Sequence, residues 1–181
     1  MASYLIYDVL GGLSKGAIYH HFKSKEEILE TVTNRMTEES NKILAKIRDR
    51  KDLTGKEKLK MIFTESLNRS VQEEIFAAAP NISKSPTLLF SMFRDTVDGV
   101  SPNYILPIIR EGVADGTIRT DCPEELAELI ILLANIWMNP MVFGNSPEQI
   151  YRKLSVFRQM MQGFGLDILD EEIQDRMKEL T

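Results

Sequence analysis

The chain is poor in the residues that most often carry enzyme chemistry. Its 181 residues include one cysteine and two histidines, so no disulfide can form within the chain and few nucleophile–base pairs can be built. The sequence contains no glycine-rich phosphate loop and no metal-ligand spacing. The histidines, His20 and His21, are adjacent, and neighbouring helical residues point about 100° apart, which suits a shared metal ion poorly. We expect no enzyme activity, no metal site and no cofactor.

The chain also lacks a basic excess and an apolar run of membrane length. Its formal net charge is −5, so any contact with nucleic acid must come from a local basic patch. The longest uncharged stretch, residues 129–147, is interrupted by Asn135, Asn139 and Pro140, which leaves too few apolar residues for a span of about 20. The first twelve residues do not resemble a signal peptide. We expect a cytoplasmic protein, and the lone thiol of Cys122 fits that reducing compartment.

The spacing of apolar residues is helical nearly throughout, and no alternating strand pattern occurs, so we predict an all-α fold. Residues 24–27 (SKEE) and 54–57 (TGKE) are capping boxes, each of which opens a helix. Further helix starts are predicted at Ser85-Pro86, Ser101-Pro102, Asp121–Glu124 and Ser146–Gln149, and a helix end at Asp115-Gly116. A short amphipathic helix is predicted over residues 170–180. The helix after Ser24 is predicted to end near Lys51 and to turn the following residues inward: Ile28, Leu29, Val32, Met36, Ile43 and Ile47.

Two helices, at 121–140 and 147–163, are apolar on more than one side and therefore need neighbours on both sides. We expect the second side to meet a second copy of the chain, giving a four-helix interface in a homodimer. The alternative is that both helices are central in one monomeric core. The residues predicted at the dimer interface are Leu126, Ile130, Leu133, Leu154, Phe157 and Met161.

Residues 13–30, LSKGAIYHHFKSKEEILE, are locally basic, with three lysines and no acid between residues 14 and 25. Ser14 is predicted to cap a short helix with Ile18 and Phe22 turned inward. A helix N-terminus offers free N–H groups to phosphate, and small residues in the first turn let a helix enter the major groove. This pattern indicates DNA binding.

The segment resembles the recognition helix of tetracycline-repressor (TetR) family regulators, followed by the start of the next helix. The resemblance is carried by small residues, then Ile18-Tyr19-x-x-Phe22, then Lys23-x-Lys25-Glu26-Glu27. It implies a ligand-responsive transcriptional repressor that binds a palindromic operator in double-stranded DNA as a homodimer. The DNA-binding residues it implies are Ser14, Lys15, Gly16, Ala17, Tyr19, His20, Lys23 and Lys25.

The sequence departs from the family pattern before residue 13, where the family has two helices and this chain offers room for one short helix. The expected organisation is a truncated helix-turn-helix DNA-binding region at 1–30, followed by a helical ligand-binding and dimerisation domain at 31–181. DNA binding is expected to be weakened or lost in the chain as given. The alternative function is a dimeric helical module that binds a small molecule or a protein and no longer binds DNA.

The middle of the chain is the expected effector site. The family resemblance implies a small hydrophobic or aromatic effector bound between these helices; ordinary core packing is the alternative for each residue. The residues predicted to bind it are Phe63, Phe76, Phe90, Phe93, Tyr104 and Trp137.

Overall fold

The computed structural model describes residues 22, 24–66, 85–143 and 146–169, and every regular element among them is a helix. The all-α prediction is therefore confirmed. The elements are α3 (Lys25–Arg48), α4 (Gly55–Ser66), α6 (Pro86–Arg94), η1 (Asp95–Ile105), α7 (Leu106–Ala114), α8 (Pro123–Leu132), η2 (Leu133–Trp137), α9 (Pro140–Phe143) and α10 (Pro147–Gly163). The predicted helix at 170–180 lies outside the described residues.

Helix starts follow the predicted caps because a side-chain oxygen accepts an N–H that the first turn leaves unpaired. Ser24 Oγ accepts from the N–H of Glu27 at 3.1 Å. The box at 54–57 is reciprocal: the backbone N–H of Thr54 donates to Glu57 Oε2 at 2.8 Å, and the N–H of Glu57 donates to Thr54 Oγ1 at 3.3 Å. Ser85 and Ser146 cap α6 and α10 as predicted. The predicted end at Asp115-Gly116 is also confirmed, with Gly116 at φ +80°.

The predicted helix start at Ser101-Pro102 is wrong. Helices α6, η1 and α7 follow one another without a break, and Ser101 lies buried within η1. Proline has no N–H and its ring clashes with the carbonyl four residues back, so an ordinary α-turn at Pro102 is unfavourable. The helix widens instead into π-turns, in which an N–H reaches five residues back, as Leu106 N–H does to the carbonyl of Ser101. The result is a rod that spans residues 86–114.

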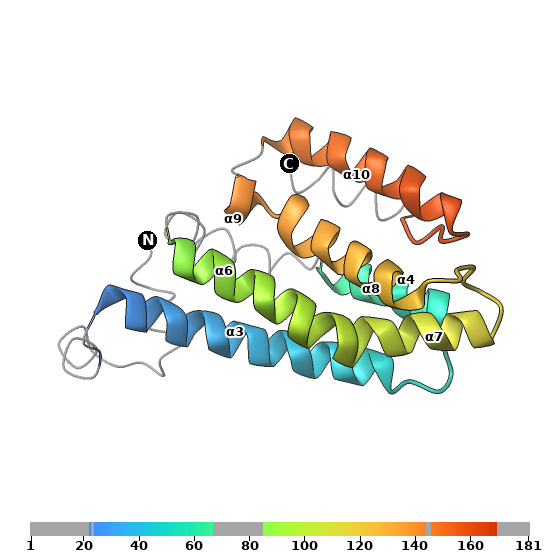
Figure 1. Cartoon of the computed structure of the whole chain (residues 1–181), viewed down its shortest axis with the longest axis horizontal. Coiled ribbons are helices and arrows are strands. Elements are labelled where there is room, and N and C mark those ends of the chain that lie inside the picture. The colour runs from blue at the N-terminus through green and yellow to red at the C-terminus, as the bar shows by residue number, and fades with distance from the viewer. Residues whose placement is uncertain (1–21, 23, 67–84, 144–145, 170–181) are drawn as a thin grey trace.

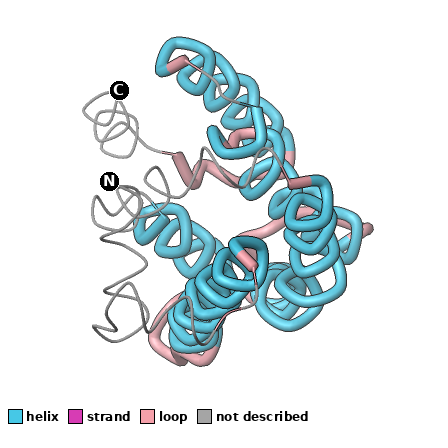
Figure 2. The backbone as a smooth tube through the Cα atoms, turned by 90° about the vertical axis from the view of Figure 1, so that its left-hand side faces the viewer, coloured by secondary structure: helices cyan, strands magenta, loops and turns pink. Residues whose placement is uncertain are grey.

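In Figure 1 the rod lies between α3 and α8, and α10 lies beyond α8. Figure 2 shows the same helices from the end. The core draws on α4, η1, α7, α8 and α10, and on residues 166–169 after α10. At its centre, the rings of Phe63 and Phe157 lie 5.3 Å apart at 45°. In the described part of α3, Ile47 is buried as predicted, but Ile43 is 40% exposed, so its predicted inward position is wrong.

Candidate functional site

The candidate nucleic-acid interface adjoins the start of α3. Seven of its predicted residues lie outside the described part of the chain: Ser14, Lys15, Gly16, Ala17, Tyr19, His20 and Lys23. Lys25 is the first residue of α3, but its side chain is also outside that part. The structure describes two residues next to this segment. Phe22 is half-buried, as predicted for an inward residue, and Ser24 caps the start of α3.

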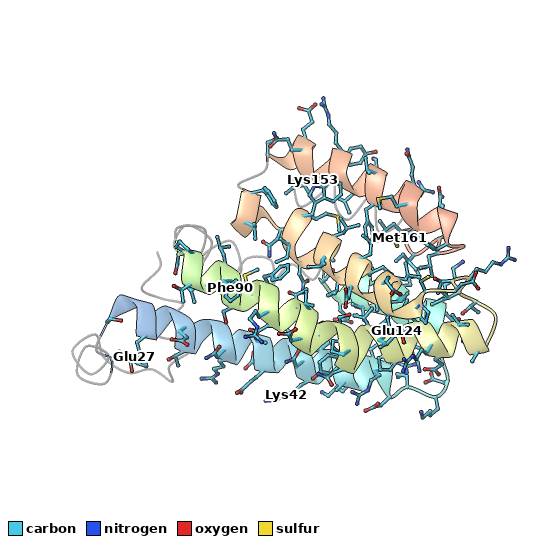
Figure 3. All side chains as sticks on the ribbon, in the orientation of Figure 1. Glu27, Lys42, Phe90, Glu124, Lys153 and Met161 are labelled. Carbon is cyan, nitrogen blue, oxygen red and sulfur yellow. The ribbon has the colours of Figure 1, made fainter. Side chains whose placement is uncertain are left out.

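Helix α3 joins this interface to the rest of the protein. Its 24 residues correspond to a length of about 36 Å. The helix runs straight through residues 30 and 31, where the two predicted domains would meet, so a boundary there would fall inside one rigid element. Figure 3 labels Glu27 near the start of α3 and Lys42 in its second half.

The far end of α3 is held by charged groups. Arg48 Nη1 donates to the carbonyl oxygen of Asn103 in η1 at 2.9 Å, and its guanidinium lies 5.5 Å from the centre of the Tyr104 ring. The side-chain hydrogen bond with Asp49 raises the pKa of Arg48 and lowers the pKa of Asp49. Lys58 Nζ, fully buried, donates to the carbonyl of Arg48 at 3.0 Å and pairs with Glu111 of α7.

The predicted effector residues are spread over different surroundings. Phe63 is part of the core, whereas Phe90 and Phe93 of α6 are 64% and 45% exposed. Phe90 is labelled on α6 in Figure 3. Tyr104 and Trp137 are half-buried, each beside a cation, Arg48 and Lys153 respectively. Phe76 lies outside the described residues. Phe63, Tyr104 and Trp137 thus share the core cluster, Phe63 within it and the other two packed against it, whereas Phe90 and Phe93 are exposed.

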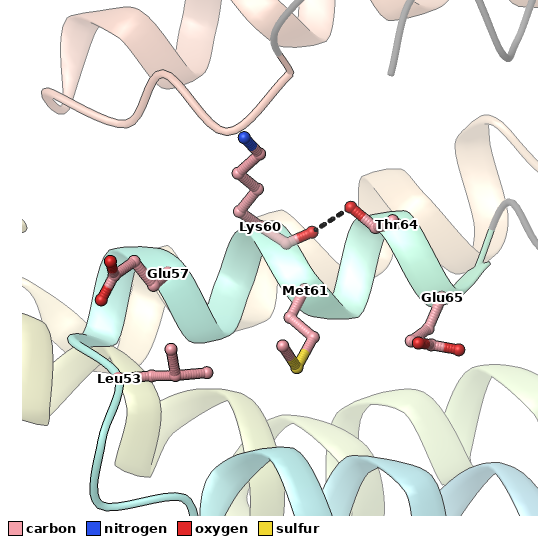
Figure 4. Close-up of a pocket in the computed structure, with 6 residues that line it drawn as sticks. All are labelled: Leu53, Glu57, Lys60, Met61, Thr64 and Glu65. Carbon is pink, nitrogen blue, oxygen red and sulfur yellow. Dashed lines mark hydrogen bonds between the residues drawn. The ribbon is translucent and has the colours of Figure 1, made fainter. Parts of the chain in front are cut away.

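A surface hollow of about 260 Å³ lies along α4, and none of these aromatics lines it (Figure 4). Three of its residues, Glu57, Met61 and Glu65, recur every four positions and so share one helix face. The sequence prediction missed this hollow because it considered only the opposite, buried face, with Leu59 and Phe63. The hollow is lined by Leu53, Glu57, Lys60, Met61, Thr64 and Glu65.

The residues predicted at the dimer interface pack inside one subunit. Phe157 and Met161 are fully buried, Leu126, Ile130 and Leu154 are buried, and Leu133 is half-buried. The apolar side chains that α10 presents to solvent are Tyr151, Val156 and Met160. An interface on α10 would therefore involve its outer face.

Lys153 was not predicted as a site residue, although it occupies an unusual position. Its ammonium donates to the carbonyl of Trp137 and lies 5.3 Å from the centre of that ring and 4.3 Å from the centre of the Phe143 ring. Burial lowers its pKa. The contact holds α10 to the end of η2, where the last helical carbonyls need donors.

No described helix has both the length and the apolarity needed to cross a bilayer. No group of three His, Cys, Asp or Glu side chains in that part of the chain is placed to hold a metal ion.

Part of the chain matches a known protein family. Residues 12–32 fit the model of bacterial regulatory proteins of the tetR family. The matched segment contains all eight predicted DNA-binding residues and ends within the first turns of α3. No curated protein matches the chain.

Proposed function

We propose that this chain, whose residues 12–32 match the tetR family of bacterial regulatory proteins, is a DNA-binding transcriptional regulator of that type, that it represses transcription by binding a palindromic operator as a homodimer, and that a small apolar or aromatic effector releases it. The regulator would act in the cytoplasm. The observation that carries the proposal is the match over residues 12–32, because it coincides with the locally basic segment ahead of α3.

The N-terminal and C-terminal parts of the chain are proposed to have different functions. Residues 1–30 contact DNA, with lysines and Tyr19 on phosphates and the first turn of the recognition helix, at Lys15 and Ala17, on base edges. Residues 31–181 bind the effector and the second subunit. A two-fold axis between subunits would match the two halves of a palindrome.

The effector is proposed to bind against the aromatic side chains of α6 that face away from the core. Phe90 and Phe93 leave apolar surface available, and burying such surface against a ligand is favourable. An effector changes the affinity for DNA only to the extent that it binds one spacing of the two DNA-binding regions in the dimer more tightly than another.

Selection from a random duplex library with the purified protein tests DNA recognition. We expect enrichment of a palindrome with two half-sites about one helical turn apart. Lys25→Ala should weaken binding to every duplex and reduce the slope of log affinity against log salt by about 1, because each phosphate contact releases counterions. Lys42→Ala is the control, since Lys42 is an exposed lysine on the same helix about 25 Å away. Unselective binding, or equal effects of the two variants, would overturn the proposal.

Effector release is tested on the selected duplex by fluorescence anisotropy with a panel of hydrophobic and aromatic compounds. We expect a subset to dissociate the complex, and Phe93→Ala to weaken that response without altering DNA affinity. Phe143→Ala is the control, because Phe143, on α9, is also an exposed aromatic, at 55% against 45% for Phe93. No response to any compound would remove the effector from the proposal.

A further inference from the structure

Two aromatic rings lie beside the end of a helix in the C-terminal part of the chain. Helix α8 continues directly into η2, so the helix that begins at Pro123 ends at Trp137. The carbonyl groups at a helix C-terminus carry a partial negative charge, which favours a cation. The ring of Trp137 is attached to this helix end, and the ring of Phe143 comes from the short helix α9 that follows it.

Lys153 of α10 places its ammonium among these groups. Its Nζ donates to the carbonyl oxygen of Trp137 and lies 5.3 Å from the centre of the Trp137 ring and 4.3 Å from the centre of the Phe143 ring. Ring faces attract an ammonium group within about 6 Å of the ring centre. The groups that hold the cation therefore come from η2 and α9, while α10 supplies the cation (Figure 3).

The charge of Lys153 is stabilised without a carboxylate. Among the ion pairs of the described residues, none includes Lys153. Burial, rather than a neighbouring charge, lowers its pKa. Ring faces that surround a positive charge are the means by which proteins recognise organic ammonium ions. Phe143 is 55% exposed, so a cation from solution can reach its ring.

We propose that Trp137 and Phe143 form a binding site for organic ammonium ions, which Lys153 occupies from within the chain. An ammonium ion that displaces Lys153 breaks the contact between α10 and the end of η2. This ligand is a cation, unlike the apolar or aromatic effector proposed to bind at α6, so the two sites are tested with different compounds.

The first test removes the internal cation and supplies one from solution. Propylammonium is the probe for Lys153→Ala, because it matches the part of the lysine side chain that alanine lacks. Trp137 is the only tryptophan of the chain, so its fluorescence reports on the site. We expect a saturable change with propylammonium and none with propanol, a neutral molecule of the same size. Wild type should need severalfold more propylammonium, because a tethered group competes at a high effective concentration.

Two further variants separate a cation site from a general effect of the ion. In the Lys153→Ala background, Phe143→Leu keeps an apolar side chain but removes a ring face. It should weaken the response to propylammonium about fivefold, the effect of one cation–π contact. Arg152→Ala is the matched control, because it removes the neighbouring cation of α10, which is 76% exposed and pairs with Glu148. It should create no response.

The second test detects displacement of Lys153 in the wild-type chain. Lysines are acylated with an amine-reactive ester, and the labelling rate of each is followed by mass spectrometry. Tetramethylammonium is the competitor, because it has no N–H that the ester could acylate. Compared with sodium chloride at the same concentration, tetramethylammonium chloride should raise the labelling rate of Lys153 severalfold. The rate at Lys42, an exposed lysine of α3, should not change.

The proposal is overturned if propylammonium and propanol act alike on Lys153→Ala, or if Phe143→Leu leaves the response unchanged. A labelling rate of Lys153 that is equal in the two salts overturns it as well. If Lys153→Ala does not fold, the labelling rates in the wild-type chain decide alone. Neither test contains DNA, so failure here is distinct from failure to select an operator.

Discussion

Gly55 and Gly112 bring the backbones of α4 and α7 into contact. A Cβ atom on Gly55 would lie 2.7 Å from the carbonyl oxygen of Ile108 and closer still to the backbone of Gly112. A Cβ atom on Gly112 would in turn overlap the side chain of Ile118. Both glycines are buried, so neither neighbour has free space into which to move. The two helices can approach this closely only because Gly55 has no side chain, and the missing side chain of Gly112 leaves room for Ile118.

Gly55→Ala should therefore destabilise the protein by about 1–3 kcal/mol, the usual cost of overpacking a core. Gly99→Ala is the control, because a Cβ atom added there would have nothing within 4 Å of it. Removing a glycine from a helix interior should stabilise by roughly 0.5–1 kcal/mol. Urea unfolding followed by circular dichroism measures both. Equal effects of the two substitutions would show that α4 and α7 do not meet as described.

Lys58 is a second point at which α4 depends on its neighbours. Its ammonium is fully buried, and Glu111, which is 39% exposed, is the carboxylate paired with it. Glu111→Ala would leave a buried charge with the carbonyl of Arg48 as its remaining described acceptor. We expect a loss of about 2 kcal/mol, below the 3–5 kcal/mol of a fully buried pair because solvent reaches the carboxylate.

The matched control is Glu124→Ala, which removes the carboxylate of the Arg110–Glu124 pair. Both partners there are at least half exposed, and ion pairs of this kind contribute little. The expected result is no measurable change in the urea midpoint. If Glu111→Ala is equally silent, Lys58 must have another partner or a route to water.

Asp115 should make stability depend on pH. Burial acts to raise its pKa, but hydrogen bonds from the Thr117 hydroxyl and from the N–H groups of Gly55 and Thr117, with the charge of Lys58, outweigh this and hold the pKa below its ordinary 3.8. A carboxylate with a lowered pKa stabilises the folded protein above its unfolded pKa, and this stability is lost as the pH falls through the folded value. Asp115→Asn should thus be less stable than wild type at pH 7, and the difference should shrink below about pH 4.

Urea titrations between pH 7 and pH 3 measure that difference. Asp121→Asn is the control. Asp121 is an exposed aspartate, and among the described hydrogen bonds none joins it to α4. A difference between wild type and Asp115→Asn that stays constant with pH would show that the Gly55 and Thr117 bonds do not depend on the charge.

The elements that sequence predicted well depend on local chemistry. Ser24, Thr54, Ser85 and Ser146 cap helices because the donor and acceptor lie within three residues of each other. Ser101 carries the same local signal, yet the rod continues through it. Packing of the rod against α8, α4 and α3 favours continuity, and such contacts are not visible in a sequence window.

The sites were harder to predict for a related reason. A helix that is apolar on two sides does not reveal which side its own subunit buries, and the predicted stripe of Phe157 and Met161 is the internal one. An aromatic residue likewise does not reveal whether it packs in the core, as Phe63 does, or lies exposed, as Phe90 does. The basic segment at 14–25 could be predicted because its lysines and its small first-turn residues are contiguous in the sequence.

A charge placed on the outer apolar side of α10 should have a different effect from one placed on its inner apolar side. We expect the protein to form a homodimer through the outer face of α10, burying more than about 1,000 Å² in total. Val156 is 47% exposed on that face and Met160 is 37% exposed.

Val156→Glu should shift the sedimentation of the protein from dimer towards monomer at micromolar concentration, because a charge would be buried in the interface, while the helical circular dichroism stays intact. Gln159→Glu, an equally acidic change at an exposed polar residue of the same helix, should have a much smaller effect. Phe157→Glu should instead unfold the subunit, because Phe157 is fully buried against Phe63. If the wild-type protein sediments as a monomer, the predicted homodimer is wrong. If Val156→Glu still sediments as a dimer, the interface lies on another surface.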